Sequence, residues 1–213
     1  MKKFLRFLLK NMLIAALFLN ITHSVAQNKE RKPTSDDFRV SIQNVKQTDD
    51  KTIEFDICIL KTNRKLKFEL ASFQAGIKFN TQILGGAPQS PDMTQILAGT
   101  SELADSISPM VVNTASAGLI RLAGRPAPKK GGGTLVPDKG KGLRICRLKL
   151  TNSVPFAANL SPDFQFTANV PAQKSYATRV AVYFESKILQ LDIIPDKNTV
   201  SKEPVVLNPV SGK

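Results

Sequence analysis

The sequence predicts an all-β protein, a β-sandwich of about nine strands in two antiparallel sheets that pack face to face. Apolar and polar residues alternate over most of the chain, as they do on strands with one buried face. Turn-forming residues separate these stretches, and none of them carries the apolar stripe of an amphipathic helix. With 213 residues, 42% of them hydrophobic, the chain can bury one ordinary core, so one domain is expected.

The first 26 residues are expected to be a signal peptide. Four basic residues lie among the first ten, and the uncharged apolar run 12–21 that follows is too short to span a bilayer comfortably. Small residues at Ser24 and Ala26 indicate cleavage near Ala26, before Gln27. The mature chain is therefore expected to be secreted or held at the cell surface, without a transmembrane segment. No cysteine lies near the cleavage site, so lipid attachment of the bacterial lipoprotein type is not expected.

After a flexible lead-in over residues 27–37, the sandwich domain is expected over residues 38–194. The alternating pattern predicts strands over 38–43, 53–59, 73–79, a short segment ending at Gly85, 110–115, 119–123, 143–154, 164–170, 179–185 and 189–194.

The remaining stretches of the chain are expected to be irregular. Residues 92–108 break the alternation and predict a long connection with at most one helical turn. Residues 124–142 are rich in glycine and proline and predict a loop that cannot pair in a sheet. Residues 195–213 are polar and predict a linker or tail. Gly76 interrupts the third strand, which indicates a bulge or a close approach of another backbone.

Three of the strand segments carry a family resemblance. They are TIEFDI at residues 52–57, ELASFQAGI at 69–77 and RICRLKLTN at 144–152. Together they resemble a module of exported Bacteroidetes proteins that is similar to cohesins and to the carbohydrate-binding domains of the same fold. The resemblance covers roughly residues 38–186 and implies a jelly roll of about nine strands. In cohesins the partner is a dockerin, recognised on one sheet, but no recognition residues can be mapped onto this sequence.

The C-terminal residues add to this resemblance. Such modules often precede a sorting domain for type IX secretion, which usually begins around an Asn-Pro turn. Residues 207–213, with Asn208-Pro209, resemble the opening of such a domain. Two interpretations stay open: either the chain is truncated within a longer protein, or the match is an accident of a polar tail.

The sequence argues against an enzyme and against a cofactor or metal site. Its one histidine, His23, lies in the expected signal peptide, which removes histidine-based triads and zinc sites from the mature chain. The carboxylates Asp49 and Asp50 are expected in a turn, and Glu54 and Asp56 on the outward face of a strand. These pairs could serve a glycosidase, but solvated charge is the favoured interpretation.

The two cysteines are expected to remain thiols, although an oxidising compartment would favour a bridge. Cys58 lies between the inward residues Ile57 and Ile59 and is therefore expected to face outward. Cys146 shares the parity of the inward residue Leu148 and is expected to be a small core residue.

Basic residues concentrate in the loop 124–142 and at Arg144 beside it. The rest of the net charge of +13 is dispersed along the chain, so no nucleic-acid partner is predicted. The loop could bind an acidic glycan or protein, or its charges could simply keep a mobile loop soluble. Its glycines do not match the spacing of a phosphate loop. The candidate binding residues are Arg125, Lys129, Lys130, Lys139, Lys141 and Arg144.

Two further features bear on the partner. Ser106 lies in the triplet Asp-Ser-Ile, which resembles a short O-glycosylation motif of Bacteroidetes proteins. The chain has no Trp and only two Tyr, which disfavours a flat platform for stacking sugar rings. The function expected from the sequence is a non-catalytic extracytoplasmic binding or scaffolding module, cohesin-like, for a protein or carbohydrate at the cell surface. The alternative is a purely structural spacer in a larger secreted or surface protein.

Overall fold

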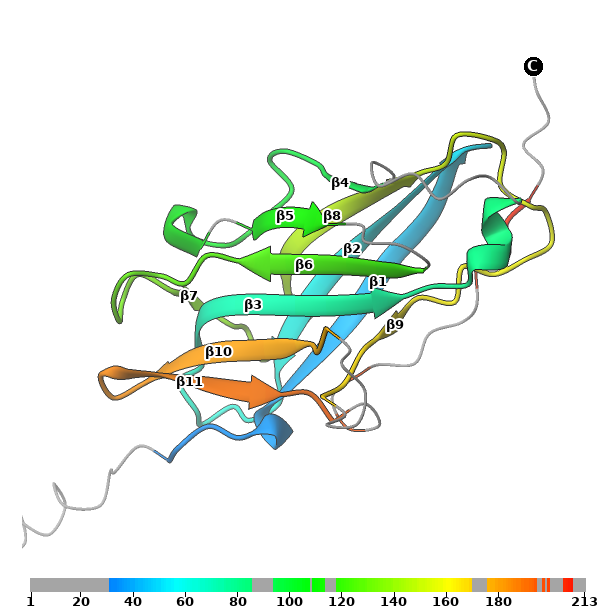
Figure 1. The fold of residues 1–213 in the computed structure, drawn as a ribbon. Coiled ribbons are helices and arrows are strands. Elements are labelled where there is room, and N and C mark those ends of the chain that lie inside the picture. The colour runs from blue at the N-terminus through cyan, green and yellow to red at the C-terminus, as the bar shows by residue number, and fades with distance from the viewer. Residues whose placement is uncertain are drawn as a thin grey trace, which may run out of the picture. The chain divides into compact units, whose positions relative to one another are not determined.

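The structure is a computed structural model that describes residues 31–85, 94–107, 109–113, 118–169, 176–194, 197, 199 and 205–208 (Figure 1). The chain divides into two units, Met1–Lys32 and Pro33–Lys213, and only residues 31 and 32 of the first are described. The expected signal peptide, and residues 209–213 of the expected sorting-domain opening, lie outside the described residues. In the described part of the chain, no helix has the length and apolar character needed to cross a membrane.

The described elements are almost all strands, with three short 3₁₀ helices. In chain order they are η1 (Ser35–Asp37), β1 (Phe38–Asp49), β2 (Thr52–Lys61), β3 (Glu69–Lys78), η2 (Thr81–Leu84), β4 (Thr94–Ile96), η3 (Asp105–Ile107), β5 (Pro109–Asn113), β6 (Leu119–Gly124), β7 (Thr134–Leu135), β8 (Leu143–Thr151), β9 (Gln165–Phe166), β10 (Arg179–Phe184) and β11 (Lys187–Asp192).

These strands form two antiparallel sheets, which confirms the predicted β-sandwich. One sheet has four strands in the order β1-β2-β8-β4. The other has seven strands: β11-β10-β3-β6-β5 form its main path, and β7 and β9 pair with the two ends of β3. Figure 1 shows β1, β2 and β8 as one layer behind a second layer of β6, β3, β10 and β11.

The core lies between the two sheets, where the alternating apolar side chains meet. On β2 the inward residues Ile53, Phe55, Ile57 and Ile59 are fully buried. From the facing sheet, β3, β6 and β10 contribute buried residues to the same cluster, among them Leu70, Phe73, Ile77, Ile120, Leu122, Val180 and Val182. A period of two therefore places one face of each sheet in a shared core and leaves the other face outside it.

Gly76 lies in β3 where a second stretch of backbone approaches closely, as predicted. A Cβ at this position would lie 2.0 Å from the carbonyl oxygen of Tyr176 and 2.2 Å from Oγ1 of Thr167. The carbonyl of Gly76 accepts a hydrogen bond from the backbone N–H of Thr167 at 2.8 Å. Any side chain here would force apart segments that are about 90 residues apart in sequence.

Three segments differ from the sequence-based expectation. The short strand expected before Gly85 is the 3₁₀ helix η2, because the Asn80 side chain accepts the N–H of Gln82 and Gly85, at φ 62°, ends the turn. The loop 124–142 contains β7, which pairs with Glu69 and Leu70 of β3, so the prediction that it cannot pair was wrong. The connection 92–108 holds the single helical turn expected, η3, together with the short strand β4.

The C-terminal region contains a segment that packs on the sandwich, although a linker or tail was expected. Leu207 is fully buried in the main core cluster. Its N–H donates to the carbonyl of Leu160 and its carbonyl accepts from the N–H of Asn159, both at 2.9 Å. The mostly polar composition of residues 195–213 concealed this anchor, which ends the short apolar run 205–207. Upstream, Thr199 forms an isolated parallel bridge with Val40 of β1.

Both cysteines are buried, and in the structure both are free thiols. Cys146 lies in the core, as expected. Cys58 has the outward parity expected of it and pairs in register with Ser41 and Arg144, but it is only 4% exposed. Burial raises the pKa of the Cys146 thiol to about 12, and the charge of Asp56 acts in the same direction.

Replacing Leu207 tests whether the C-terminal segment belongs to the folded domain. Leu207→Ala removes a fully buried side chain and should lower the free energy of unfolding by about 2–4 kcal/mol. Val206→Ala is the matched control, because Val206 is 50% exposed, and should change it by less than about 0.5 kcal/mol. Urea unfolding of the two variants measures the difference. Equal stabilities would contradict the packing.

The raised pKa of Cys146 predicts low thiol reactivity in the folded protein. In a Cys58→Ser variant, Cys146 is the one remaining cysteine. At pH 8 only about 1 in 10⁴ of its thiols would be ionised at a pKa near 12, and burial also blocks access. Labelling with a disulfide reagent should therefore be at least about 100-fold slower in the folded variant than in urea. Rapid labelling without denaturant would show that the site opens to solvent.

Candidate functional site

The outer face of the four-stranded sheet carries a fixed network of charged side chains, and a bulge in β8 creates it. Ile57 of β2 pairs with Cys146, whereas Cys58 pairs with Arg144, so β8 has one extra residue at Ile145. On either side of this bulge the apolar residues of β8 point inward. As a result, Arg144 and Arg147 both reach the outer face, although they are three positions apart.

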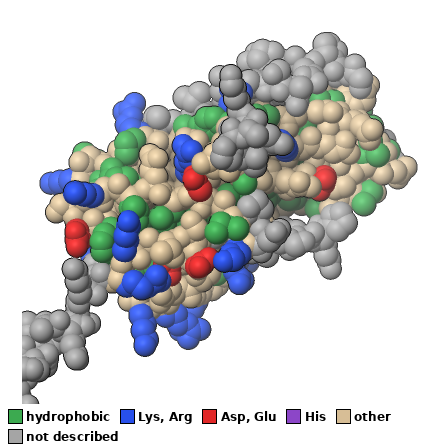
Figure 2. Space-filling view, turned by 60° about the horizontal axis from the view of Figure 1, so that its bottom comes forward, with side chains coloured by type: hydrophobic (Ala, Val, Ile, Leu, Met, Phe, Trp, Pro, Cys, Tyr) green, Lys and Arg blue, Asp and Glu red, His purple; other side chains and the backbone are tan. Residues whose placement is uncertain are grey.

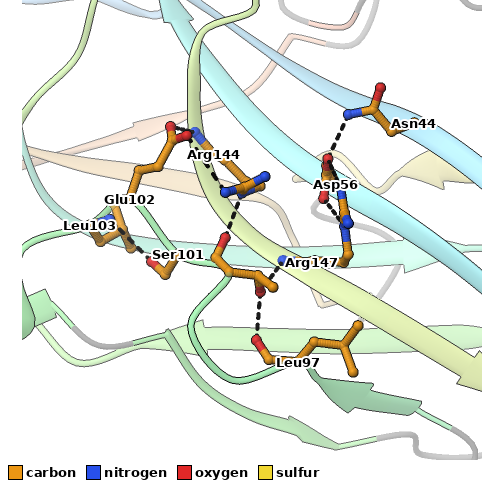
Figure 3. A network of polar contacts seen from close by, with 9 residues as sticks. Asn44, Asp56, Leu97, Ser101, Glu102, Leu103, Arg144 and Arg147 are labelled. Carbon is orange, nitrogen blue, oxygen red and sulfur yellow. Dashed lines mark hydrogen bonds and ion pairs between the residues drawn. The ribbon is translucent and has the colours of Figure 1, made fainter.

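Asp56 is the centre of this network (Figure 3). Arg147 grips it with two parallel hydrogen bonds, from Nε to Oδ1 at 2.7 Å and from Nη2 to Oδ2 at 2.9 Å. The Asn44 side chain donates a third, from Nδ2 to Oδ2 at 2.6 Å. Asn44 reaches the carboxylate from an irregular point of β1, where its backbone has a φ of 52°. The carboxylate is therefore satisfied on both oxygens.

Asp56 is 1% exposed, so the expectation of a solvated charge was wrong for this residue. Parity placed it correctly on the outer face, but Arg147 lies across it and excludes water. Burial by itself raises the pKa of Asp56. The hydrogen bonds from Arg147 and Asn44, with the positive charges of Arg147 and Arg144, outweigh burial and hold the pKa below 3.8. Asp56 is thus ionised and fully engaged at neutral pH.

A second set of contacts joins Arg144 to the segment that follows β4. The Arg144 guanidinium donates from Nε to the carbonyl of Thr100 at 2.6 Å and forms an ion pair with Glu102 at 3.7 Å. The backbone N–H of Arg144 also donates to the Glu102 carboxylate, at 2.8 Å. Thr100 accepts the backbone N–H of Arg147 at 3.1 Å through its hydroxyl. Arg144, one of the predicted loop residues, is therefore part of the sheet network rather than of a loop.

A row of charges crosses the same face next to this network. Register places Lys46 of β1 opposite Glu54 of β2, and Glu54 opposite Lys149 of β8. Gln95 of β4 continues the row beyond Lys149. Lys46 and Gln95 are exposed, and the other two are half-buried. The outer face thus presents long polar side chains of both signs on four neighbouring strands.

The remaining predicted loop residues separate into two groups. Lys129 and Lys130 lie in a turn that is clamped to β3, because buried Glu69 accepts the N–H of Gly131 at 2.6 Å and of Gly133 at 3.0 Å. Arg125 lies at the start of the same turn. Lys139 and Lys141 lie beyond β7, in the connection that leads into β8. All five side chains are exposed: Arg125, Lys129, Lys130, Lys139 and Lys141.

Ser106 lies in η3, and its side chain is engaged. Its hydroxyl donates to the carbonyl of Gly132, and the residue is half-buried. The neighbouring backbone is also tied to this region, because the N–H of Ala104 donates to the hydroxyl of Thr134 at 2.7 Å. A glycan on Ser106 would have to replace the bond to Gly132. Modification of Ser106 stays a prediction.

The other predicted carboxylates lie where the sequence placed them. Asp49 ends β1, and its carboxylate accepts the N–H of Lys51 at 2.8 Å within the turn to β2. Glu54 lies on the outer face, in the charged row. Within the described ranges, no three or more His, Cys, Asp or Glu residues lie together in an arrangement that could hold a metal ion.

Comparison with known proteins finds likeness of structure only. No family model and no curated protein matches the chain. A chain of the CaDoc0917–CaCohA2 complex aligns at a TM-score of 0.41 with 12% identity, over 74% of this chain and 99% of that one. The seventh ScaB type I cohesin from Pseudobacteroides cellulosolvens aligns at 0.40 with 8% identity, over 80% and 97%. Endoglucanase CelQ from Clostridium thermocellum, complexed with cellotriose, aligns at 0.39 with 9% identity, over 67% of this chain and 25% of that one.

Removing the charge of Asp56 tests the network. Asp56→Asn should lower the free energy of unfolding at pH 7 by about 1–2 kcal/mol, because it weakens hydrogen bonds made to a charged group. The native pKa is depressed, so the wild-type contribution is present above pH 3.8 and is lost as the pH falls through the lowered value. The difference between the two proteins should therefore vanish in acid. Urea midpoints between pH 2 and pH 7 measure it.

Glu54→Gln is the matched control for that measurement. Glu54 lies on the same strand and the same face, but it is half-exposed. This change should alter stability by less than about 0.5 kcal/mol. An equal loss in both variants would mean that the sheet responds to net charge rather than to the Asp56 network.

Proposed function

We propose that this chain is a non-catalytic extracytoplasmic binding module that holds a protein or a carbohydrate at the cell surface. The binding surface is the outer face of the four-stranded sheet. The observation that carries the proposal is the buried carboxylate of Asp56, which fixes Arg147 and Asn44 on this face. Side chains already held in place lose less conformational entropy when a partner binds, so such a face suits recognition.

The chemistry of this face favours binding over catalysis. A general acid or base needs a pKa near the working pH and a free position for the proton it transfers. Asp56 has a lowered pKa, and both of its oxygens accept hydrogen bonds from Arg147 and Asn44. The single histidine of the sequence, His23, precedes the expected cleavage site. These features support a binding role.

Hydrogen bonds and charges, rather than aromatic stacking, are the contacts that this face can offer. The sequence contains no Trp, and its two tyrosines belong to the other sheet region. Tyr183 is buried, with its hydroxyl bonded to the carbonyl of Ala127 at 2.6 Å. Tyr176 is half-buried, and its ring lies 5.7 Å from the Arg121 guanidinium. The chemistry fits a polar protein surface or a soluble, hydrogen-bonding sugar better than a crystalline polysaccharide.

A triple substitution on the sheet face tests the proposal. The full chain is offered to a glycan array and to surface-exposed proteins of the source cell, and the ligand it retains is then titrated. The face variant is Lys46→Ser, Glu54→Ser and Lys149→Ser. It should weaken that affinity at least about tenfold, because it removes three charged side chains from the proposed contact. The control variant is Lys78→Ser, Glu185→Ser and Lys187→Ser, which makes the same charge change elsewhere and should bind like wild type.

Two results would overturn the proposal. Retention of neither a glycan nor a protein by the folded wild-type chain would favour the alternative, a purely structural spacer in a larger secreted or surface protein. Equal losses in the face and control variants would show that binding does not use this face.

A further inference from the structure

Two connections that are distant in sequence meet at one end of the sandwich. The first, residues 62–68, joins β2 to β3, and the second, residues 136–142, joins β7 to β8. The N–H of Lys61 donates to the carbonyl of Pro137, and the N–H of Val136 donates to the carbonyl of Phe68, both at 2.9 Å. The second connection is therefore held beside both ends of the first.

The second connection is also fixed against the edge of the four-stranded sheet. The carbonyl of Lys141 accepts a hydrogen bond from the Gln43 side chain at 2.9 Å. Gly142 has a φ of +83°, and a Cβ there would lie 2.6 Å from the carbonyl oxygen of Ile59, so the backbone can pass this close only as glycine. Arg39 of β1 lies opposite Leu60, next to this point. The basic residues of both connections thus stand on anchored backbone.

Six exposed basic side chains surround this end, and we name them the cationic end. In the described part of the chain, none of the six forms an ion pair. Asp138, which is half-buried, is the acidic residue within the two connections. Of the nearby acidic residues, Asp36 pairs with Lys197 at 3.4 Å and Asp37 is buried. The cationic end consists of Arg39, Arg64, Lys65, Lys67, Lys139 and Lys141.

The surface view agrees with a local excess of positive charge. Lys and Arg side chains gather over the lower part of the face shown in Figure 2. A cluster of one sign raises the local concentration of opposite charge and speeds association with it. The predicted basic loop contributes only Lys139 and Lys141 to this cluster, and the β2–β3 connection supplies three residues that were not predicted.

We infer that the cationic end binds a linear acidic polysaccharide, with sulfate or carboxylate groups repeated along its chain. This inference goes beyond the proposed function, because it concerns the end of the sandwich rather than the sheet face, and either surface can bind without the other. A repeating anion matches several cations spread over two connections and Arg39. Each pair that forms releases counterions, so the affinity should fall steeply with salt.

The apolar residues of the two connections favour a polysaccharide over the other polyanions. Phe68 is their one aromatic residue and is 1% exposed, so these two connections offer no ring on which a nucleic-acid base could stack. Leu66 and Val136 are also buried, so these connections offer little apolar surface to the core of a protein interface. Leu135 precedes the second connection and is exposed, but a single exposed leucine is ordinary on a protein surface.

Dextran sulfate and unsulfated dextran are suitable probes, because they share one backbone and differ in charge. The full wild-type chain should bind dextran sulfate in 0.15 M salt and should not bind dextran. The end variant replaces Arg64, Lys65, Lys67, Lys139 and Lys141 with Gln. It should bind at least about tenfold more weakly, with a shallower dependence of log affinity on log salt, because fewer counterions are released.

The control variant removes the same charge from other exposed positions, one Arg and four Lys. It replaces Lys78, Arg125, Lys129, Lys130 and Lys187 with Gln, and it should stay within about threefold of wild type. The inference is overturned if wild type does not bind dextran sulfate, if both variants lose affinity equally, or if duplex DNA of equal charge binds more tightly. The sheet-face triple variant should bind dextran sulfate like wild type, so failure of one proposal is distinguishable from failure of the other.

Discussion

The change of phase within β8 is the constraint on which both faces of the four-stranded sheet depend. Strict alternation from Leu143 would put Leu148 and Leu150 on the same face as Arg144, outside the core. The extra residue at Ile145 shifts the register by one, so that apolar side chains point inward on both sides of the bulge. Because of the bulge, β8 places apolar side chains in the core along its whole length and still presents Arg144 and Arg147 on the outer face.

Those two arginines then organise the surface around them. Arg147 covers Asp56, and the cost of burying that carboxylate is offset by charge-assisted hydrogen bonds to both oxygens. Arg144 ties Thr100 and Glu102 along the edge of β8, beyond the three residues of β4. The edge of the sheet is therefore covered by a segment that is held by hydrogen bonds from both side chains and backbone. One backbone irregularity consequently determines the core, the charged face and the covered edge.

The sequence predicts most strands of this fold because apolar and polar residues alternate along them with a period of two. β1, β2, β3, β8, β10 and β11 lie where the alternation of apolar and polar residues predicts strands. The bulge also has a signal in the sequence, because Leu143 and Ile145 have the opposite parity to Leu148 and Leu150, which strict alternation does not allow. Two-residue strands such as β7 have no period to detect, since their pairing depends on where β3 lies in space.

Tertiary placement explains what the sequence did not reveal about the surfaces. Parity puts Asp56 on the outer face, but it says nothing about an arginine lying across it. The same limit applies to the C-terminal anchor Leu207, which ends a short apolar run in an otherwise polar stretch. The cationic end joins connections about 70 residues apart, so it exists only once Val136 and Pro137 are bonded to the two ends of the β2–β3 connection. Composition indicated the basic residues of the second connection, Lys139 and Lys141, but not those of the β2–β3 connection.

The sheet face and the cationic end differ in how their charges are balanced, and this predicts different kinds of recognition. On the face, Arg147 and Arg144 already have carboxylate partners, and Lys46 and Lys149 flank Glu54. A partner there must fit an existing arrangement of positive and negative charges. Binding therefore depends on the match in geometry, and long-range attraction contributes little. At the end, the cations have no ion-pair partner among the described residues, so an anion gains contacts without displacing any. Attraction there is long-ranged, weakly selective and sensitive to salt. In a chain that uses both surfaces, the cationic end would therefore bind an acidic polysaccharide, and the sheet face would select the specific partner.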